Sequence, residues 1–274
     1  MKSGATKIFR GALADLPTLV EHHLFVICPN NSGSTFLRNA LATSRATWNL
    51  PREGQHTFGF AGPSSRALGA ATIWATRPQW VAAFQNPANF DWVTTRRAWY
   101  FQAFSRSAGA TVFVEKSPPF LLLVDQLVDS FSDARFLFMV RDPYATAEGI
   151  SRRLCLAGYE RQERLALAAL HLALCLEAQA ENLRRYGHLG TFFSYEDMCD
   201  RPQQVQAQIA GLMPQLADLD LRQQLPVKGS YDEPLRNMNE QQWGRLSGED
   251  LATLNRVYGE CEALLANFGY RLRG

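Results

Sequence analysis

The apolar run His23-Leu-Phe-Val-Ile-Cys28 is followed directly by Pro29-Asn-Asn-Ser-Gly-Ser-Thr35, a stretch of small and polar residues. A short run of aliphatic and aromatic residues predicts a strand that is buried on both faces of a sheet. The small residues after it, and the helical pattern that continues through Leu41, predict a tight loop at the start of a helix. The backbone N–H groups of such a loop and the positive end of the helix dipole together attract a phosphate group.

Three further apolar runs occur along the chain, at 111–116, 135–140 and 191–195. Amphipathic segments lie between them, and the longest of these runs over 160–186 and is followed by Gly187. Short apolar strands that alternate with helices indicate a parallel sheet with helices on both faces. The predicted fold class is therefore α/β.

The composition is that of one globular domain over residues 1–274, since 46% of the residues are hydrophobic and 20% are charged. The formal net charge is only +2, which makes a nucleic-acid partner a poor expectation. Five cysteines without a C-x-x-C pair are typical of free thiols in a reducing compartment. The N-terminus lacks the apolar core of a signal peptide, and no stretch reaches the roughly 18 apolar residues of a membrane helix. We therefore expect a cytoplasmic protein without a transmembrane segment.

The segment 57–108 is rich in aromatic residues and is interrupted at Pro63, Pro78 and Pro87. Its period is helical but irregular, which fits an insertion that covers the substrate. An ordinary helical flank of the core explains the same pattern equally well, so both interpretations stay open.

Charged and aromatic residues follow the ends of three predicted strands, in the segments FVEKSP (113–118), FMVRDP (138–143) and SYEDM (194–198). The carboxyl ends of parallel strands meet at one edge of the sheet, where such folds bind ligands. In this order and spacing, these segments and the loop at 29–35 resemble those of the sulfotransferase family. The similarity runs from about residue 22 to the end and is weaker across 57–108.

The resemblance implies a P-loop-like fold and the transfer of a sulfuryl group from 3′-phosphoadenosine-5′-phosphosulfate (PAPS) to an acceptor hydroxyl. The product nucleotide would be adenosine 3′,5′-bisphosphate (PAP). The transferred group carries only one negative charge and the sequence offers no cluster of metal ligands, so we expect no metal. A glycan, a tyrosine or another phenol, and a lipid-like small molecule all remain open as acceptors.

In the family, the first loop consists of a cation followed by Ser-Gly-Thr-Thr and holds the 5′-phosphosulfate. The last four positions are matched here by Ser32, Gly33, Ser34 and Thr35. Asn31 replaces the cation, and an amide brings no charge to the leaving phosphate. The tyrosylprotein branch has a catalytic Lys in its segment that matches FVEKSP, so Lys116 is the candidate for this charge.

The segment FMVRDP resembles the family's 3′-phosphate site, which implies that Arg141 forms a fork with that phosphate. The family expects a Ser eight residues later, where this chain has Gly149. Arg153 lies one helical turn further along the same face, and we expect Arg153, or else Arg152, to supply the missing contact.

Tyr195 matches an aromatic residue that lies near the adenine in related enzymes, and a buried core tyrosine is the alternative. Two late segments, Val227-Lys-Gly229 and Leu235-Arg-Asn237, are similar to family elements that contact the phosphates. Lys228 and Arg236 are therefore assigned to the cofactor phosphates.

Glu53 lies in NLPREGQ (49–55) and matches the catalytic Glu of the glycan-modifying and tyrosylprotein branches. A carboxylate needs a raised pKa or tight positioning to act as a base towards a hydroxyl, and we expect partial burial to provide it. His56 is the rival base, because the cytosolic small-molecule branch uses a His. The third possibility is that neither Glu53 nor His56 is the base.

Two other functions compete with sulfuryl transfer. A P-loop kinase of a small metabolite is disfavoured because Ser34 stands where the Walker Lys belongs. A catalytically silent nucleotide-binding module is conceivable from Asn31 and Gly149, but the retained pair of Glu53 and Lys116 argues against it.

Overall fold

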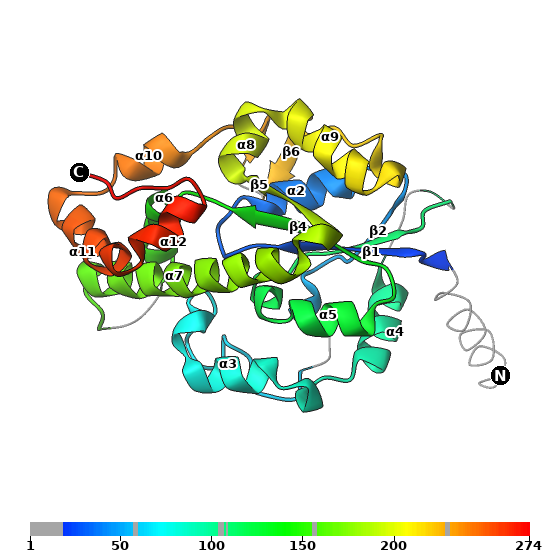
Figure 1. The fold of residues 1–274 in the computed structure, drawn as a ribbon, viewed down its shortest axis with the longest axis horizontal. Helices are drawn as coiled ribbons and strands as arrows, with labels where there is room; N and C mark the ends of the chain where they lie inside the picture. Colours follow the sequence, from blue (N-terminus) through cyan, green and yellow to red (C-terminus); the bar gives the residue numbers. More distant parts are fainter. Residues whose placement is uncertain (1–18, 57–59, 104–106, 108, 155–157, 228–230) are drawn as a thin grey trace.

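The computed structural model describes residues 19–56, 60–103, 107, 109–154, 158–227 and 231–274. Five strands form one parallel sheet in the order β2-β3-β1-β4-β5 (Figure 1). The strands are β1 (His22–Ile27), β2 (Thr47–Asn49), β3 (Val112–Glu115), β4 (Ala134–Val140) and β5 (Gly190–Ser194). The predicted α/β class is confirmed, and the four predicted strands agree with the structure to within one residue at each end.

Each face of the sheet has its own hydrophobic core, because successive side chains of a strand point to opposite sides. Phe25 and Ile27 pack on one face with residues of α3 (Pro78–Gln85), α4 (Trp92–Gln102) and α5 (Val124–Ser130). Leu24 and Val26 pack on the other face with residues of α2 (Ser34–Leu41), α8 (Tyr195–Asp200) and α9 (Pro202–Leu212). Figure 1 shows these two sets of helices on opposite sides of the sheet.

The longest helix, α7 (Arg161–Tyr186), ties together the strand ends that carry the site. It begins at a capping box between Glu160 and Glu163, and Gly187 is its C-cap. The buried amide of Gln179 donates to the carbonyls of Ile27 at 2.9 Å and Met139 at 3.2 Å. The Gln179 side chain therefore bridges the carboxyl ends of the neighbouring strands β1 and β4.

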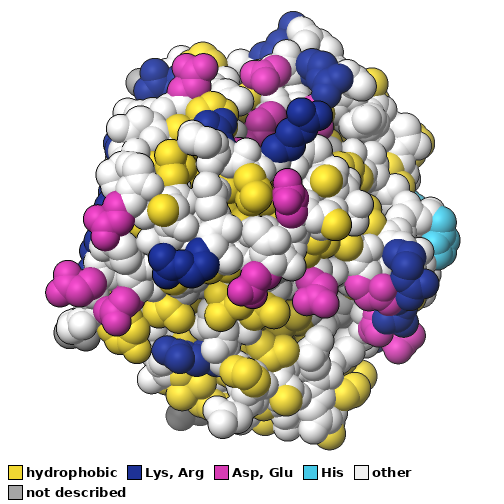
Figure 2. All heavy atoms as spheres, turned by 60° about the vertical axis from the view of Figure 1, so that its left-hand side comes forward, with side chains coloured by type: hydrophobic (Ala, Val, Ile, Leu, Met, Phe, Trp, Pro, Cys, Tyr) yellow, Lys and Arg dark blue, Asp and Glu magenta, His cyan; other side chains and the backbone are white. Residues whose placement is uncertain are grey.

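The remaining helices form a third cluster beside α7. They are α6 (Pro143–Ser151), α10 (Asn239–Trp243), α11 (Gly248–Tyr258) and α12 (Glu262–Asn267). Two short strands, β6 (Leu225–Val227) and β7 (Tyr231–Glu233), form an antiparallel pair before α10. On the face drawn in Figure 2, acidic and basic side chains are intermingled.

The described part of segment 57–108 contributes several large rings to the core. Trp74, Trp80 and Trp99 are at most 4% exposed and belong to the cluster on one face of the sheet. These three rings are thus already packed against protein, as an ordinary helical flank would have them. A substrate-covering role for the segment stays a prediction. No helix among the described residues combines the length and the apolar character that crossing a bilayer requires.

Candidate functional site

A pocket of about 660 Å³ opens where the loops after β1, β3 and β4 meet. These three strands are neighbours in the sheet, so their carboxyl ends bring together segments that are far apart in sequence. The pocket is lined by most of the predicted site residues, namely Asn31, Gly33, Ser34, Thr35, Glu53, Lys116, Arg141, Gly149, Arg153, Tyr195 and Arg236.

The predicted phosphate loop requires a glycine at position 33. Gly33 has a φ of 81°, and a Cβ atom built there would lie 2.4 Å from the ring of Tyr195. Helix α2 begins at the next residue, and the first N–H groups of a helix have no acceptor within it. The side chain of Ser32 is buried, does not line the pocket and donates to the Pro29 carbonyl at 2.7 Å, so a role of Ser32 in cofactor binding stays a prediction.

Arg141 is held in place by uncharged acceptors. Its Nε donates to Oδ1 of Asn239 at 2.8 Å, one terminal nitrogen donates to the Asn31 carbonyl at 3.1 Å, and the other donates to Oε1 of Gln242. The guanidinium also stacks on the ring of Tyr195, 4.1 Å from its centroid. Asn239 and Gln242 were not predicted from the sequence, because they lie about a hundred residues away on α10 without a local motif.

Arg153 reaches the phosphate loop, and the predicted contact of Arg153 or Arg152 with the 3′-phosphate stays a prediction. Its Nη1 donates to Oδ1 of Asn31 at 2.6 Å. Arg152 points to Glu148 instead, with an Nε–Oε1 distance of 3.1 Å. Among the described residues, no carboxylate lies within ion-pair distance of Arg141 or Arg153. Both guanidinium groups therefore keep their full charge for an anion.

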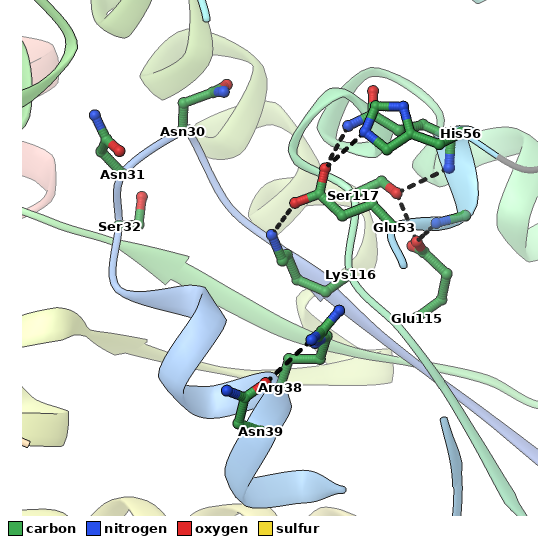
Figure 3. Close-up of polar contacts among 12 residues, drawn as sticks. Asn30, Asn31, Ser32, Arg38, Asn39, Glu53, His56, Glu115, Lys116 and Ser117 are labelled. Atoms are coloured by element: carbon green, nitrogen blue, oxygen red, sulfur yellow. Dashed lines mark hydrogen bonds and ion pairs between the residues drawn. The ribbon is translucent and has the colours of Figure 1, made fainter. Parts of the chain in front are cut away.

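Glu53 and Lys116 form an ion pair on the other side of the pocket (Figure 3). Lys116 is only 6% exposed, and the second carboxylate oxygen of Glu53 accepts from Nε2 of Gln55 at 2.6 Å. Burial acts to raise the pKa of Glu53, but the charge and hydrogen bond of Lys116 outweigh it, so the pKa lies below its usual value. The expected positioning is present, whereas the expected rise in pKa is absent because of Lys116.

His56, the rival base, lies at the margin of this pair. Its side chain is 60% exposed, it does not line the pocket, and its Nε2 is 3.6 Å from Oε2 of Glu53. In this structure it reaches the pocket only through Glu53 (Figure 3).

A second carboxylate, Glu115, holds the turn that presents Glu53. It is 1% exposed, and its Oε1 accepts from the Gly54 N–H at 2.7 Å and from the Ser117 hydroxyl at 2.5 Å. The Ser117 oxygen in turn accepts from the Gln55 N–H at 3.1 Å. Burial raises the pKa of Glu115 to about 7. Glu115 was not predicted either, although a carboxylate inside an apolar strand was a signal that could have identified it.

Tyr195 and Arg236 meet at the rim of the pocket. The Tyr195 hydroxyl donates to the Arg236 carbonyl at 2.7 Å and accepts from the Met238 N–H at 3.2 Å. Tyr195 is only 3% exposed, and Arg141 covers one face of its ring. Lys228 lies outside the described residues.

Histidine, cysteine and carboxylate side chains do not gather into a metal site: within the described ranges no three of them could hold an ion together. His22 pairs with Asp133, and His23 shares a hydrogen bond with the Tyr100 hydroxyl. Both histidines therefore have structural partners.

Comparison with known proteins places these observations in a family. The model of the sulfotransferase family matches residues 23–212, which is more than half of the chain. No curated protein sequence matches the chain.

Several solved sulfotransferase structures share the fold. The sulfotransferase domain of the olefin synthase from Synechococcus PCC 7002 is 17% identical, with a TM-score of 0.58, and the match covers 93% of this chain and 96% of that domain. A sulfotransferase from Mycobacterium avium is 15% identical, with a TM-score of 0.57, over 98% of this chain and 82% of that one. The sulfotransferase domain of the curacin biosynthetic pathway is 15% identical, with a TM-score of 0.52, over 88% of this chain and 98% of that domain.

Proposed function

This chain belongs to the sulfotransferase family, and we propose that its donor is PAPS and its acceptor a hydroxyl group. The observation that carries the proposal is the charge arrangement of one pocket. A helix N-terminus and two arginines that have no carboxylate partner among the described residues lie on one side, and a carboxylate–lysine pair lies on the other. The first set suits an anionic nucleotide and the second suits proton transfer next to a leaving anion.

The residues present fit such a donor. A pocket of about 660 Å³ lies within the range of roughly 300–1,000 Å³ that is common for small-molecule sites. The guanidinium of Arg141 has five N–H groups, and within the described part of the chain three are used by Asn239, Asn31 and Gln242. Two N–H groups therefore remain for a phosphate, on a plane that Tyr195 keeps fixed.

When bound, the donor supplies the sulfuryl group and the phosphate that leaves. Lys116 donates towards the negative charge that develops on that phosphate, in place of the cation missing at Asn31. Glu53 accepts the proton of the acceptor hydroxyl.

The ion pair links these two roles. In the resting pair, Lys116 keeps the pKa of Glu53 low and makes the carboxylate a weak base. An anion that attracts the ammonium group of Lys116 weakens the pair, and burial then raises the pKa of Glu53. The base becomes stronger when the leaving phosphate is in place.

Nucleotide binding tests the proposal most directly. Isothermal titration calorimetry should show tight binding of PAP in the presence of a chelator, because guanidinium and N–H groups act in place of a metal ion. ATP with Mg²⁺ serves as the competing ligand. Preference for ATP with Mg²⁺ over PAP would support a small-metabolite kinase and reject the proposal. If PAP is preferred, single-turnover sulfate transfer to a phenol separates an enzyme from a silent binding module.

A further inference from the structure

The two departures from the family pattern, Asn31 and Gly149, lie next to each other in space. A Cβ atom built on Gly149 would lie 3.1 Å from Nε2 of Gln242 and 3.5 Å from Nδ2 of Asn31. Two amide NH₂ groups from different parts of the chain thus converge on Gly149, which has no side chain.

Arginines fix the direction of both amides. A guanidinium group only donates hydrogen bonds, so the amide oxygens must face it. Arg153 binds Oδ1 of Asn31 and Arg141 binds Oε1 of Gln242. The nitrogen of each amide is consequently turned away from its arginine, and both nitrogens come within 3.5 Å of the position above Gly149.

The two nitrogens lack acceptors in the part of the chain that the structure describes. Nδ2 of Asn31 is buried and has no hydrogen-bond partner among the described residues. Nε2 of Gln242 likewise makes no hydrogen bond within the described ranges, although its oxygen is bound to Arg141. A buried donor without an acceptor, such as Nδ2 of Asn31, destabilises the protein, and an oxygen of a bound ligand removes this cost.

We propose that Asn31 and Gln242 together bind the 3′-phosphate of the donor beside Gly149, where a side chain would crowd the two amides. This assignment rests on the proposed function, since it assumes a nucleotide with a 3′-phosphate beside Arg141. The amide pair takes the place of the serine hydroxyl that the family carries at position 149. Its donors are held by the same two arginines that supply the positive charge.

The left-handed backbone explains why residue 31 is an asparagine. Asn31 has a φ of 60°, a conformation that asparagine tolerates better than most residues with a side chain. Its carbonyl accepts from Arg141 while its side chain accepts from Arg153. One residue thereby orients both arginines around the same position.

Calorimetric titration with two probes tests the assignment. PAP carries both phosphates, whereas adenosine 5′-monophosphate lacks the 3′-phosphate. Gln242→Ala should weaken PAP binding about tenfold or more, the scale of a hydrogen bond to a charged group, and leave the binding of adenosine 5′-monophosphate unchanged. Asn31→Gly keeps the left-handed backbone and the carbonyl used by Arg141, and it should show the same selective loss.

Replacement of the Gln242 amide by a serine at position 149 provides the matched control. In the Gln242→Ala background, Gly149→Ser should recover PAP affinity, because the hydroxyl then has room and supplies a donor. Gly149→Ala in the same background fills the space without a donor and should recover nothing. Recovery by Ser but not by Ala cannot come from a change in folding alone.

The outcomes separate this inference from the proposed function. If the wild-type protein binds PAP no better than adenosine 5′-monophosphate, both are overturned. If it prefers PAP but Gln242→Ala and Asn31→Gly bind both probes like the wild type, the amide assignment alone is wrong. Equal weakening of both probes also overturns it, since the amides would then contact the 5′-phosphate.

Discussion

On one side of the pocket Lys116 is paired with the carboxylate of Glu53, whereas on the other side Arg141 donates to two side-chain amides and a backbone carbonyl. The first pair is almost neutral as a unit. The second group carries a full positive charge and is bound by dipoles. The neighbour of Lys116 therefore neutralises its charge, whereas the neighbours of Arg141 orient the guanidinium group without neutralising it.

The difference has a physical reason. A buried ion pair must be loosened before either member can act on a ligand, so it suits a step in which charge develops late. An arginine oriented by amides keeps its charge available, so it suits ground-state binding of an anion. We therefore expect changes in the ion pair to affect turnover and changes around Arg141 to affect affinity.

The largest effects are expected from changes in the ion pair. Glu53→Gln keeps the shape of the side chain but removes the proton acceptor. Turnover should fall about 10²–10⁴-fold while the Kd of PAP changes little. Transfer of radiolabelled sulfate from PAPS to a phenol gives the rate, and calorimetry gives the Kd. Lys116→Ala should lower turnover by a similar or greater factor.

The combination of Glu53→Gln with Lys116→Ala should cost less than the product of the two separate losses, because the residues form one pair. Strict multiplication of the two losses would show that the pair does not act as a unit. A loss of PAP affinity larger than the loss of turnover would remove the distinction between the two sides of the pocket.

Arg141→Ala should produce the next largest effect. Removal of the guanidinium should weaken PAP binding by about 2–4 kcal/mol, the scale for breaking a desolvated charge pair. Arg141→Lys serves as the control that restores the charge without the fork, and it should recover only part of the affinity. Thermal unfolding of both variants verifies the fold, and wild-type affinity in Arg141→Ala would exclude Arg141 from the site.

A smaller effect is expected in the pH dependence of stability. Burial raises the pKa of Glu115 to about 7 from 4.5, so the folded protein keeps a proton that the unfolded chain releases. The stabilisation is complete below pH 4.5 and is lost as the pH rises through 7. This group should lower the free energy of unfolding by on the order of 2–3 kcal/mol across that window.

Urea unfolding of the wild type and of Glu115→Gln at pH 5 and pH 8 measures this contribution as the difference between the two proteins, and the stability lost by the wild type relative to the variant should grow as the pH rises. The lowered pKa of Glu53 acts in the opposite direction, because its stabilisation is present above its usual pKa and is lost as the pH falls. Burial lowers the pKa of His23 to about 4 and that of His171 to about 3, so both histidines also make the protein more stable as the pH rises from 5 to 8. Both histidines are unchanged in Glu115→Gln, so the difference between this variant and the wild type isolates Glu115. The same pH dependence in Glu115→Gln and in the wild type would contradict the assignment.

The smallest effect is expected from Tyr195→Phe. The ring under Arg141 remains, but the hydrogen bonds to the Arg236 carbonyl and the Met238 N–H are lost. We expect a loss of stability of about 1 kcal/mol and a change in PAP affinity of only a few-fold. A large loss of affinity would show that the hydroxyl, rather than the ring, matters for the arginine side of the pocket.

Local patterns in the sequence predicted four of the five strands of the parallel sheet, and the resemblance to the sulfotransferase family pointed to Glu53 and Lys116. The central strands are continuous apolar runs, and Lys116 follows one of them within a recognisable segment. Strand β2 was missed because three residues give no periodic signal. Asn239 and Gln242 could not be predicted, since α10 is a five-residue polar helix whose contacts with Arg141 depend on how distant segments pack.

The position of α10 in the chain has a consequence for biosynthesis. A nascent chain that has left the ribosome as far as Leu212, the end of α9, already contains all five strands of the sheet and both members of the Glu53–Lys116 pair. Arg141 still lacks its two side-chain acceptors at that stage, because Asn239 and Gln242 have not yet been synthesised. The proposed nucleotide affinity should therefore be gained only after α10 has been synthesised, and ribosome-bound chains of increasing length should acquire it abruptly once α10 has emerged.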